Sequence, residues 1–148
     1  MTVVFWCRRE SNPYNATCIE HRRTGRDGTT AGWRIHSGMM RQFNVECALQ
    51  GSGPFKMQAG GASGKQWTHS AVVYNRDEKT IAIYKNGEQQ KLEQLSGDGI
   101  FPRKDGPLLV YPIGYTSVLL DEFAIWERVL SPDEIGILYN AGLKMQHQ

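Results

Sequence analysis

The sequence predicts an all-β protein, built as a two-sheet antiparallel sandwich with one short helix near its C-terminal end. Apolar and polar residues alternate in many short segments bounded by Gly, Pro, Asn and Ser, as half-buried strands require. A helical signature is found only close to the C-terminus. The length of 148 residues is that of one domain, so we expect residues 1–148 to form a single unit.

Four expected strands occupy the first third of the chain. In residues 2–8 (TVVFWCR) apolar side chains fall on both faces, which indicates a strand covered on both sides, and residues 17–21 alternate in a similar way. The clearest alternation lies in residues 32–37 (GWRIHS) and 41–49 (RQFNVECAL), where one face is apolar and the other polar. The Gly- and Ser-rich segment from residue 51 to residue 65 is expected to be a long surface loop.

The sequence predicts five further strands for the rest of the sandwich. Residues 66–75 (QWTHSAVVYN) are rich in β-branched and aromatic residues. The dipeptide Asn86-Gly87 lies between two β-prone arms and tolerates the positive φ values of a tight hairpin turn. Two apolar strands follow at residues 107–111 (PLLVY) and 117–128 (SVLLDEFAIWER).

The expected helix begins after Ser131, which can cap it, and Pro132 suits the first helical position. Glu134 can reach back to complete a capping box. Gly142 is expected to end the helix. Three apolar residues would dock the helix onto the sandwich: Ile135, Leu138 and Tyr139.

Composition excludes several classes of function. The net charge is only +2, and the cluster Arg22, Arg23 and Arg26 is interpreted as a solvated loop, so no nucleic-acid partner is expected. No apolar run is long enough for membrane insertion, and residues 1–12 lack the pattern of a signal peptide. Three cysteines are too few for a disulfide framework and favour a reducing compartment.

Four elements of the second half occur in the order typical of one family. They are QWTHSAVVY, IAIYKNGEQQ, LLDEFAIWERVLS and SPDEIGILYNAG. The chain therefore resembles the laminin-G-like jelly-roll domains of the concanavalin-A-like lectin and glucanase group, from Gln66 to Gly142 and more weakly at TVVFWCRR and GWRIHS. This resemblance implies a concanavalin-A-like jelly roll and a binding or adhesion module.

Two features depart from that family. Members usually open with an additional strand before the one that matches Thr2, and they carry a glycine where this chain has Leu119. A sandwich without the opening strand has an uncovered edge. We expect a neighbouring chain, a second copy, the chain's own terminus or an upstream segment to cover it.

The sequence gives little evidence for a catalytic site or a metal site. Glycosidases of this architecture place two carboxylates on one strand face, whereas Glu46 shares its face with Asn44, so no enzyme is expected. No cofactor is expected either. The resemblance allows a structural calcium at Asp121, but the missing opening strand removes the expected partner ligands, and a hydrogen-bonding role is favoured.

The candidate binding site is a polar sheet face, with the loop residues Tyr14 and Phe55 expected nearby. Its five members are Arg34, His36, Gln42, Asn44 and Glu46. The main hypothesis is a non-catalytic module that recognises a glycan or a protein on a surface, as part of a larger assembly. The alternatives are a structural decoration or accessory subunit of a virion and a degenerate glycosidase-like domain. The localisation favoured is a virion or another surface-exposed assembly.

Overall fold

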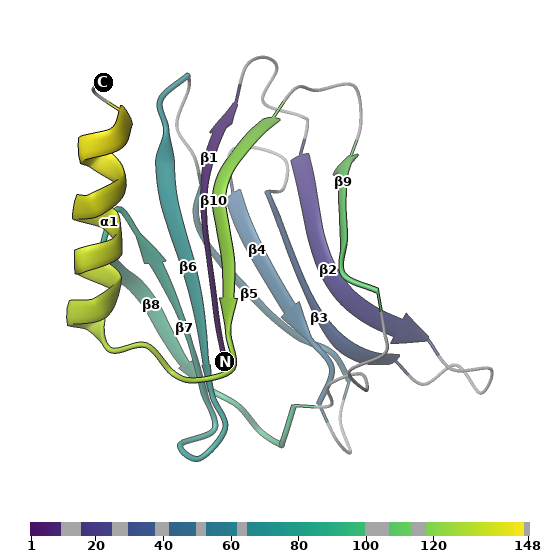
Figure 1. The fold of residues 1–148 in the computed structure, drawn as a ribbon. Helices are drawn as coiled ribbons and strands as arrows, with labels where there is room; N and C mark the ends of the chain where they lie inside the picture. Colours follow the sequence, from purple (N-terminus) through teal and green to yellow (C-terminus); the bar gives the residue numbers. More distant parts are fainter. Residues whose placement is uncertain are drawn as a thin grey trace.

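The computed structural model describes residues 1–9, 16–24, 30–37, 42–49, 53–61, 65–99, 107–113 and 118–146. Their strands form two antiparallel five-stranded sheets, stacked as a sandwich (Figure 1). Sheet A has the order β10 (Val118–Trp126), β1 (Thr2–Arg9), β6 (Thr68–Asn75), β7 (Thr80–Lys85) and β8 (Glu88–Gln94). Sheet B has the order β5 (Phe55–Gly60), β4 (Gln42–Cys47), β3 (Thr30–Ser37), β2 (Ala16–Thr24) and β9 (Leu109–Ile113). With the helix α1 (Pro132–Gln146) after β10, the predicted jelly-roll sandwich is confirmed.

The core lies between the sheets and consists of side chains that alternate inward along the strands. Cross-strand pairing aligns them in rows that run from strand to strand. One such row in sheet B contains Ile19, Ile35, Val45 and Met57, and a row in sheet A contains Val3, Val72 and Ile83. None of these side chains is more than 3% exposed. The apolar residues that alternate along each strand in the sequence are therefore the ones that form these inward rows.

Strand β1 is buried on both faces, as its sequence predicts. Val3 and Phe5 pack between the sheets. Val4 faces outward and packs with Leu130 and Ile135 at the start of α1. Figure 1 shows α1 lying against the outer face of sheet A. The helix thus covers the second apolar face of β1.

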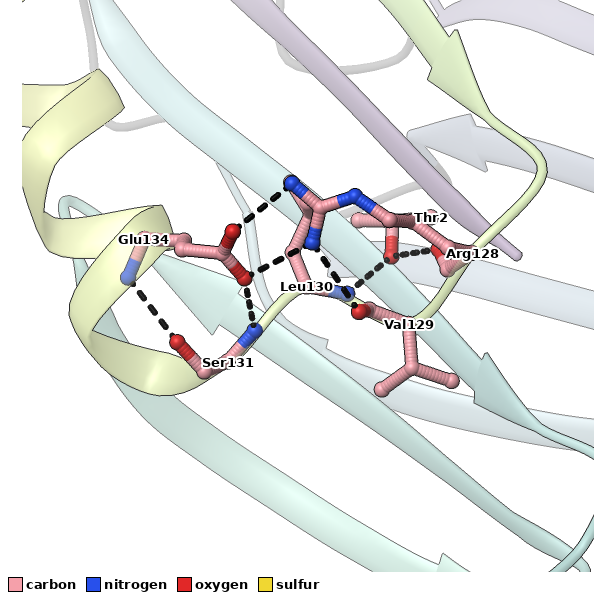
Figure 2. A network of polar contacts seen from close by, with 6 residues as sticks. All are labelled: Thr2, Arg128, Val129, Leu130, Ser131 and Glu134. Carbon is pink, nitrogen blue, oxygen red and sulfur yellow. Dashed lines mark hydrogen bonds and ion pairs between the residues drawn. The ribbon is translucent and has the colours of Figure 1, made fainter.

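Helix α1 begins with the reciprocal hydrogen bonds that the sequence predicts (Figure 2). The backbone N–H of Glu134 donates to Oγ of Ser131 at 3.2 Å, and the N–H of Ser131 donates to the Glu134 carboxylate at 2.8 Å. Pro132 is the first helical residue. A hydrogen bond from Arg128, together with the cap, lowers the pKa of Glu134 to about 2. The capping box is therefore confirmed.

The end of α1 differs from the prediction, because the helix passes Gly142 and continues to Gln146. The space that a side chain would need at position 142 is filled by the indole of Trp6: a Cβ there would lie 2.5 Å from Nε1. Trp6 is 1% exposed and stacks on Tyr139, with 5.7 Å between ring centroids. The glycine allows the helix and the sheet to approach closely and does not end the helix.

A buried hydroxyl ties the start of β1 to the segment between β10 and α1 (Figure 2). Oγ1 of Thr2 donates to the carbonyl of Arg128 at 3.0 Å and accepts from the N–H of Leu130 at 3.0 Å. Thr2 is fully buried. The hydroxyl satisfies two backbone groups that no strand or helix pairs, and so fixes the approach to α1.

The Asn86-Gly87 hairpin is confirmed. It joins β7 to β8, and the two residues have φ values of 52° and 81°. Asn86 also holds the neighbouring strand β6: its N–H donates to the carbonyl of His69 at 2.9 Å, and its Oδ1 accepts from the N–H of His69 at 3.1 Å.

The predicted loop over residues 51–65 is wrong in part, because Phe55–Gly60 forms strand β5. β5 pairs with β4 at six successive positions, and Met57 is 1% exposed. Met57 points into the core, whereas the outward-facing residues of β5 are polar or small. The strand character of β5 therefore depends on pairing with β4, which local sequence does not reveal.

Strand β1 is an inner strand, paired with β10 on one side and β6 on the other. Among the described residues, the strands with a free edge are β8 and β10 in sheet A and β5 and β9 in sheet B. The covering of such an edge by another segment stays a prediction.

Candidate functional site

The outer face of sheet B carries a row of charged side chains across four neighbouring strands. Pairing places Glu20 of β2 beside Arg34 of β3, Arg34 beside Glu46 of β4, and Glu46 beside Lys56 of β5. Their neighbours along each strand point into the core, so these side chains face outward. We call this surface the polar face and define it by seven residues: Glu20, Arg22, Arg34, His36, Asn44, Glu46 and Lys56.

Glu46 is the centre of the polar face. Nη2 of Arg34 donates to its carboxylate at 2.7 Å. Nζ of Lys56 and Nε2 of His36 lie 3.8 Å from the carboxylate, and Nη1 of Arg22 lies 4.0 Å from it. One cation is thus tightly bound, and the other groups are close without a short hydrogen bond.

The charge state of Glu46 follows from these neighbours. Burial alone would raise its pKa, but the charge and the hydrogen bond of Arg34, with the charges of Lys56 and His36, hold the pKa below its ordinary value. The carboxylate is therefore ionised at neutral pH and accepts hydrogen bonds. Nε of Arg34 is buried and has no hydrogen-bond partner in the part of the chain that the structure describes.

A hollow of about 370 Å³ opens beside this network. It is lined by Arg22, Thr30, Arg34, Glu46, Ala48, Leu49, Pro54 and Lys56. The side chains of Arg22 and Lys56 are 35% and 66% exposed, so two cations face solvent at the hollow. A ligand in the hollow would meet these cations and the bound Arg34–Glu46 pair together.

The position opposite Arg22 on β3 carries no side chain, because it is Gly32. It pairs with Arg22 across β2 and β3 and has a φ of 107°, a conformation that other residues rarely adopt. A Cβ at this position would lie 1.9 Å from the carbonyl oxygen of His21. Glycine is therefore required here by the backbone itself.

The structure brings four of the five predicted site residues together. Arg34 and Glu46 are bonded, and His36 and Asn44 form the next cross-strand pair of the same face. Gln42 lies further along β4, exposed and opposite Gly60. Binding of a ligand by these five residues stays a prediction.

Of the two loop residues expected beside the site, the structure describes Phe55, which does not extend it. Phe55 lies in β5 and packs against the core. Tyr14 lies outside the described residues.

Sequence reasoning missed three members of the polar face. Arg22 was interpreted as part of a loop, but Arg22 and Arg23 lie in β2, whereas Arg26 falls outside the described residues. Lys56 lies in β5, within the predicted loop, and Glu20 has no unusual neighbour in the sequence. Their places on the polar face come from strand register, which the chain does not signal locally.

Asp121, which the resemblance allows as a calcium ligand, lies in β10, and calcium binding there stays a prediction. Its side chain accepts a hydrogen bond from the N–H of Glu122 at 2.8 Å, and Glu122 has a φ of 48° at an irregularity in the pairing of β10 with β1. No cluster of three or more His, Cys, Asp or Glu side chains that would hold a metal occurs within the described ranges. Burial raises the pKa of the Cys47 thiol to about 11, which leaves it unreactive at neutral pH.

Two stacked antiparallel sheets, one with an open polar face, define a lectin-like β-sandwich. The chain belongs to the concanavalin A-like lectin/glucanases superfamily, because the model of the family Laminin_G_3 matches residues 1–136. The resemblance found in the second half of the sequence is confirmed and extends to the first strand. Within the described residues no helix has the length and apolarity needed to cross a membrane.

Individual proteins and structures resemble parts or all of the chain. The chain is 29% identical over 85 residues to adhesion G-protein coupled receptor D1 of Bos taurus, a match that covers 56% of this chain and 9% of the receptor. The carbohydrate-binding module CBM40 of the Ruminococcus gnavus IT-sialidase, bound to α2,3-sialyllactose, has a TM-score of 0.69 at 13% identity and covers 93% of this chain and 80% of its own.

The binding domain of botulinum neurotoxin DC, in a complex with SialylT, has a TM-score of 0.71 at 16% identity. It covers 95% of this chain and 35% of its own. At these identities the two solved structures establish a shared fold.

Proposed function

We propose that this chain is a non-catalytic recognition module that binds a glycan through the polar face of sheet B, and that the glycan carries an acidic sugar. The observation that supports this most is the Arg34–Glu46 pair, held at 2.7 Å beside a hollow that two further cations line. Structures of similar fold were solved with α2,3-sialyllactose or SialylT bound, which supports a sialylated ligand.

The chemistry of the polar face suits sugar hydroxyls. A hydroxyl both donates and accepts, so it pairs well with a fixed carboxylate and a fixed guanidinium. Because Arg34 and Glu46 already hold each other, little side-chain freedom is lost when a sugar binds. Arg22 and Lys56 would then be available to the carboxylate of an acidic sugar.

The ionisation of Glu46 argues against hydrolysis. A glycosidase needs one carboxylic acid with a raised pKa to protonate the leaving oxygen. The pKa of Glu46 is lowered, so this carboxylate is a poor general acid at neutral pH. Recognition without catalysis is the function that this charge state favours.

The test is the affinity of the chain for α2,3-sialyllactose and for lactose, measured by titration calorimetry. We expect binding of sialyllactose and weaker binding of lactose. Lys56→Ala and Arg22→Ala should each weaken sialyllactose binding about tenfold or more, because each removes one charge-assisted contact. Lys91→Ala on β8 is the matched control and should leave the affinity unchanged.

Two results would oppose the proposal. Equal affinity for both sugars would contradict the part of the proposal that requires an acidic sugar in the ligand. A chain that binds neither sugar nor any member of a glycan array would favour the alternative structural role.

A further inference from the structure

The two sheets end on the same side of the sandwich in strands whose outer edge pairs with no other strand among the described residues. These are β10 in sheet A and β9 in sheet B, which both lie toward the viewer in Figure 1. At the opposite side, β5 and β8 contact each other. We call the first side the β9/β10 edge.

The core is open at the β9/β10 edge. Val110 of β9 is paired with Ile19, and Ile125 of β10 is paired with Val3, so both point between the sheets. Val110 is nevertheless 50% exposed and Ile125 40%, whereas Ile19 and Val3 are 1% and 0% exposed. Side chains that belong to the core by their register therefore remain in water at this edge.

The opposite edge is protected. There the positions of β8 that pair with Ile83 and Ile81 are Lys91 and Glu93, which form an ion pair. Inward-pointing charges of this kind prevent a sheet edge from pairing with another chain. Met57 of β5 is also fully covered. The contrast marks the β9/β10 edge as the surface that needs a partner.

The β9/β10 edge is apolar and uncharged along β9. No charged residue occurs from Pro107 to Ile113. Large apolar side chains are exposed along it: Leu108, Leu109, Val110 and Tyr111, with Leu119 and Ile125 on β10. An exposed apolar strand edge is a template for pairing with another strand, although Pro112 can accept a hydrogen bond along it but cannot donate one.

We propose that the β9/β10 edge docks onto a second copy of this chain, with β9 pairing antiparallel to β9 of the copy about a two-fold axis near Val110. A two-fold contact sets a surface against itself, so the surface must carry no charges that would face their own copies. β9 meets this condition. β10 does not, because the exposed Asp121 and Glu122 of two copies would come together, and like charges opposite each other are destabilising.

The first experiment is sedimentation equilibrium of the purified chain over a range of concentrations. We expect a species of twice the monomer mass. Val110→Lys places two ammonium groups opposite each other at the axis and should abolish that species. Leu92→Lys is the matched control, because Leu92 is an exposed leucine on the edge strand β8, and it should leave the dimer intact.

A charge-pair experiment keeps the proposal testable if a single variant behaves poorly. Chains with Val110→Lys and with Val110→Glu should each be monomeric and should associate when mixed. Amide exchange of Val110 and of its neighbours Leu109, Tyr111 and Ile113 should slow with rising concentration; Pro112 has no amide proton. Three results would each overturn the proposal: a chain that is monomeric at every concentration, a dimer that survives Val110→Lys, or a dimer that Leu92→Lys dissociates. In the first case the β9/β10 edge would have to be covered by a different segment.

Discussion

The two glycines of α1 provide a sharp test of how the helix packs on sheet A. Nothing lies within 4 Å of a Cβ built at Gly136, so Gly136→Ala should raise the free energy of unfolding by about 1 kcal/mol, the helix-propensity difference between the two residues. At Gly142 the same gain is opposed by a contact of 2.5 Å with the indole of Trp6, about 1 Å shorter than van der Waals contact. Overpacking of this kind costs about 1–3 kcal/mol.

Trp6 cannot move away cheaply, because it is almost fully buried and stacked on Tyr139. We therefore expect Gly142→Ala to lower the free energy of unfolding by up to about 2 kcal/mol, against a rise for Gly136→Ala. Urea unfolding followed by tryptophan fluorescence measures both values. If both alanine variants were stabilised to the same degree, the close approach of α1 to Trp6 would be refuted.

Three further predictions concern stability. Thr2→Val keeps the shape of the side chain but leaves the N–H of Leu130 and the carbonyl of Arg128 without a partner, so urea unfolding should show a loss of about 2 kcal/mol. Burial lowers the pKa of His69 to about 4, whereas the unfolded chain takes up the proton near 6.5. Stability is therefore lost as pH falls from about 6.5 to 4, by about 3 kcal/mol relative to a His69→Phe variant measured in parallel, and parallel pH profiles would contradict this. Gly32→Ala should lower the free energy of unfolding by about 3 kcal/mol, because a Cβ would collide with a backbone carbonyl at an unfavourable φ; a neutral effect would contradict the geometry.

The features that the sequence predicts well are those fixed by neighbouring residues. Asn86-Gly87 adopts the positive φ values of its turn because of its own residue types, and Ser131 and Glu134 satisfy each other within one turn of helix. Alternation along β1 indicates burial on both faces because each face has its own apolar residues. In each case the physical cause lies within about ten residues of the chain.

The features that the sequence does not predict depend on distant partners. Gly142 looks like a helix stop, and only the position of Trp6 explains why a glycine stands there inside the helix. The polar face likewise depends on register, since Lys56 and Arg22 reach Glu46 only when β5, β4, β3 and β2 are aligned. The sequence therefore predicts the centre of the candidate site, at Arg34 and Glu46, without its outer cations.

The most direct test of the account is an NMR titration of the isotope-labelled chain with α2,3-sialyllactose, using lactose as the comparison. The proposal predicts that backbone and side-chain shifts concentrate on β2 to β5, with Arg22, Arg34 and Lys56 among the residues that respond most to sialyllactose. Lys56→Ala should reduce the response, and lactose should produce a weaker one. An absence of shifts, or shifts confined to α1 or to the β9/β10 edge, would contradict binding at the polar face.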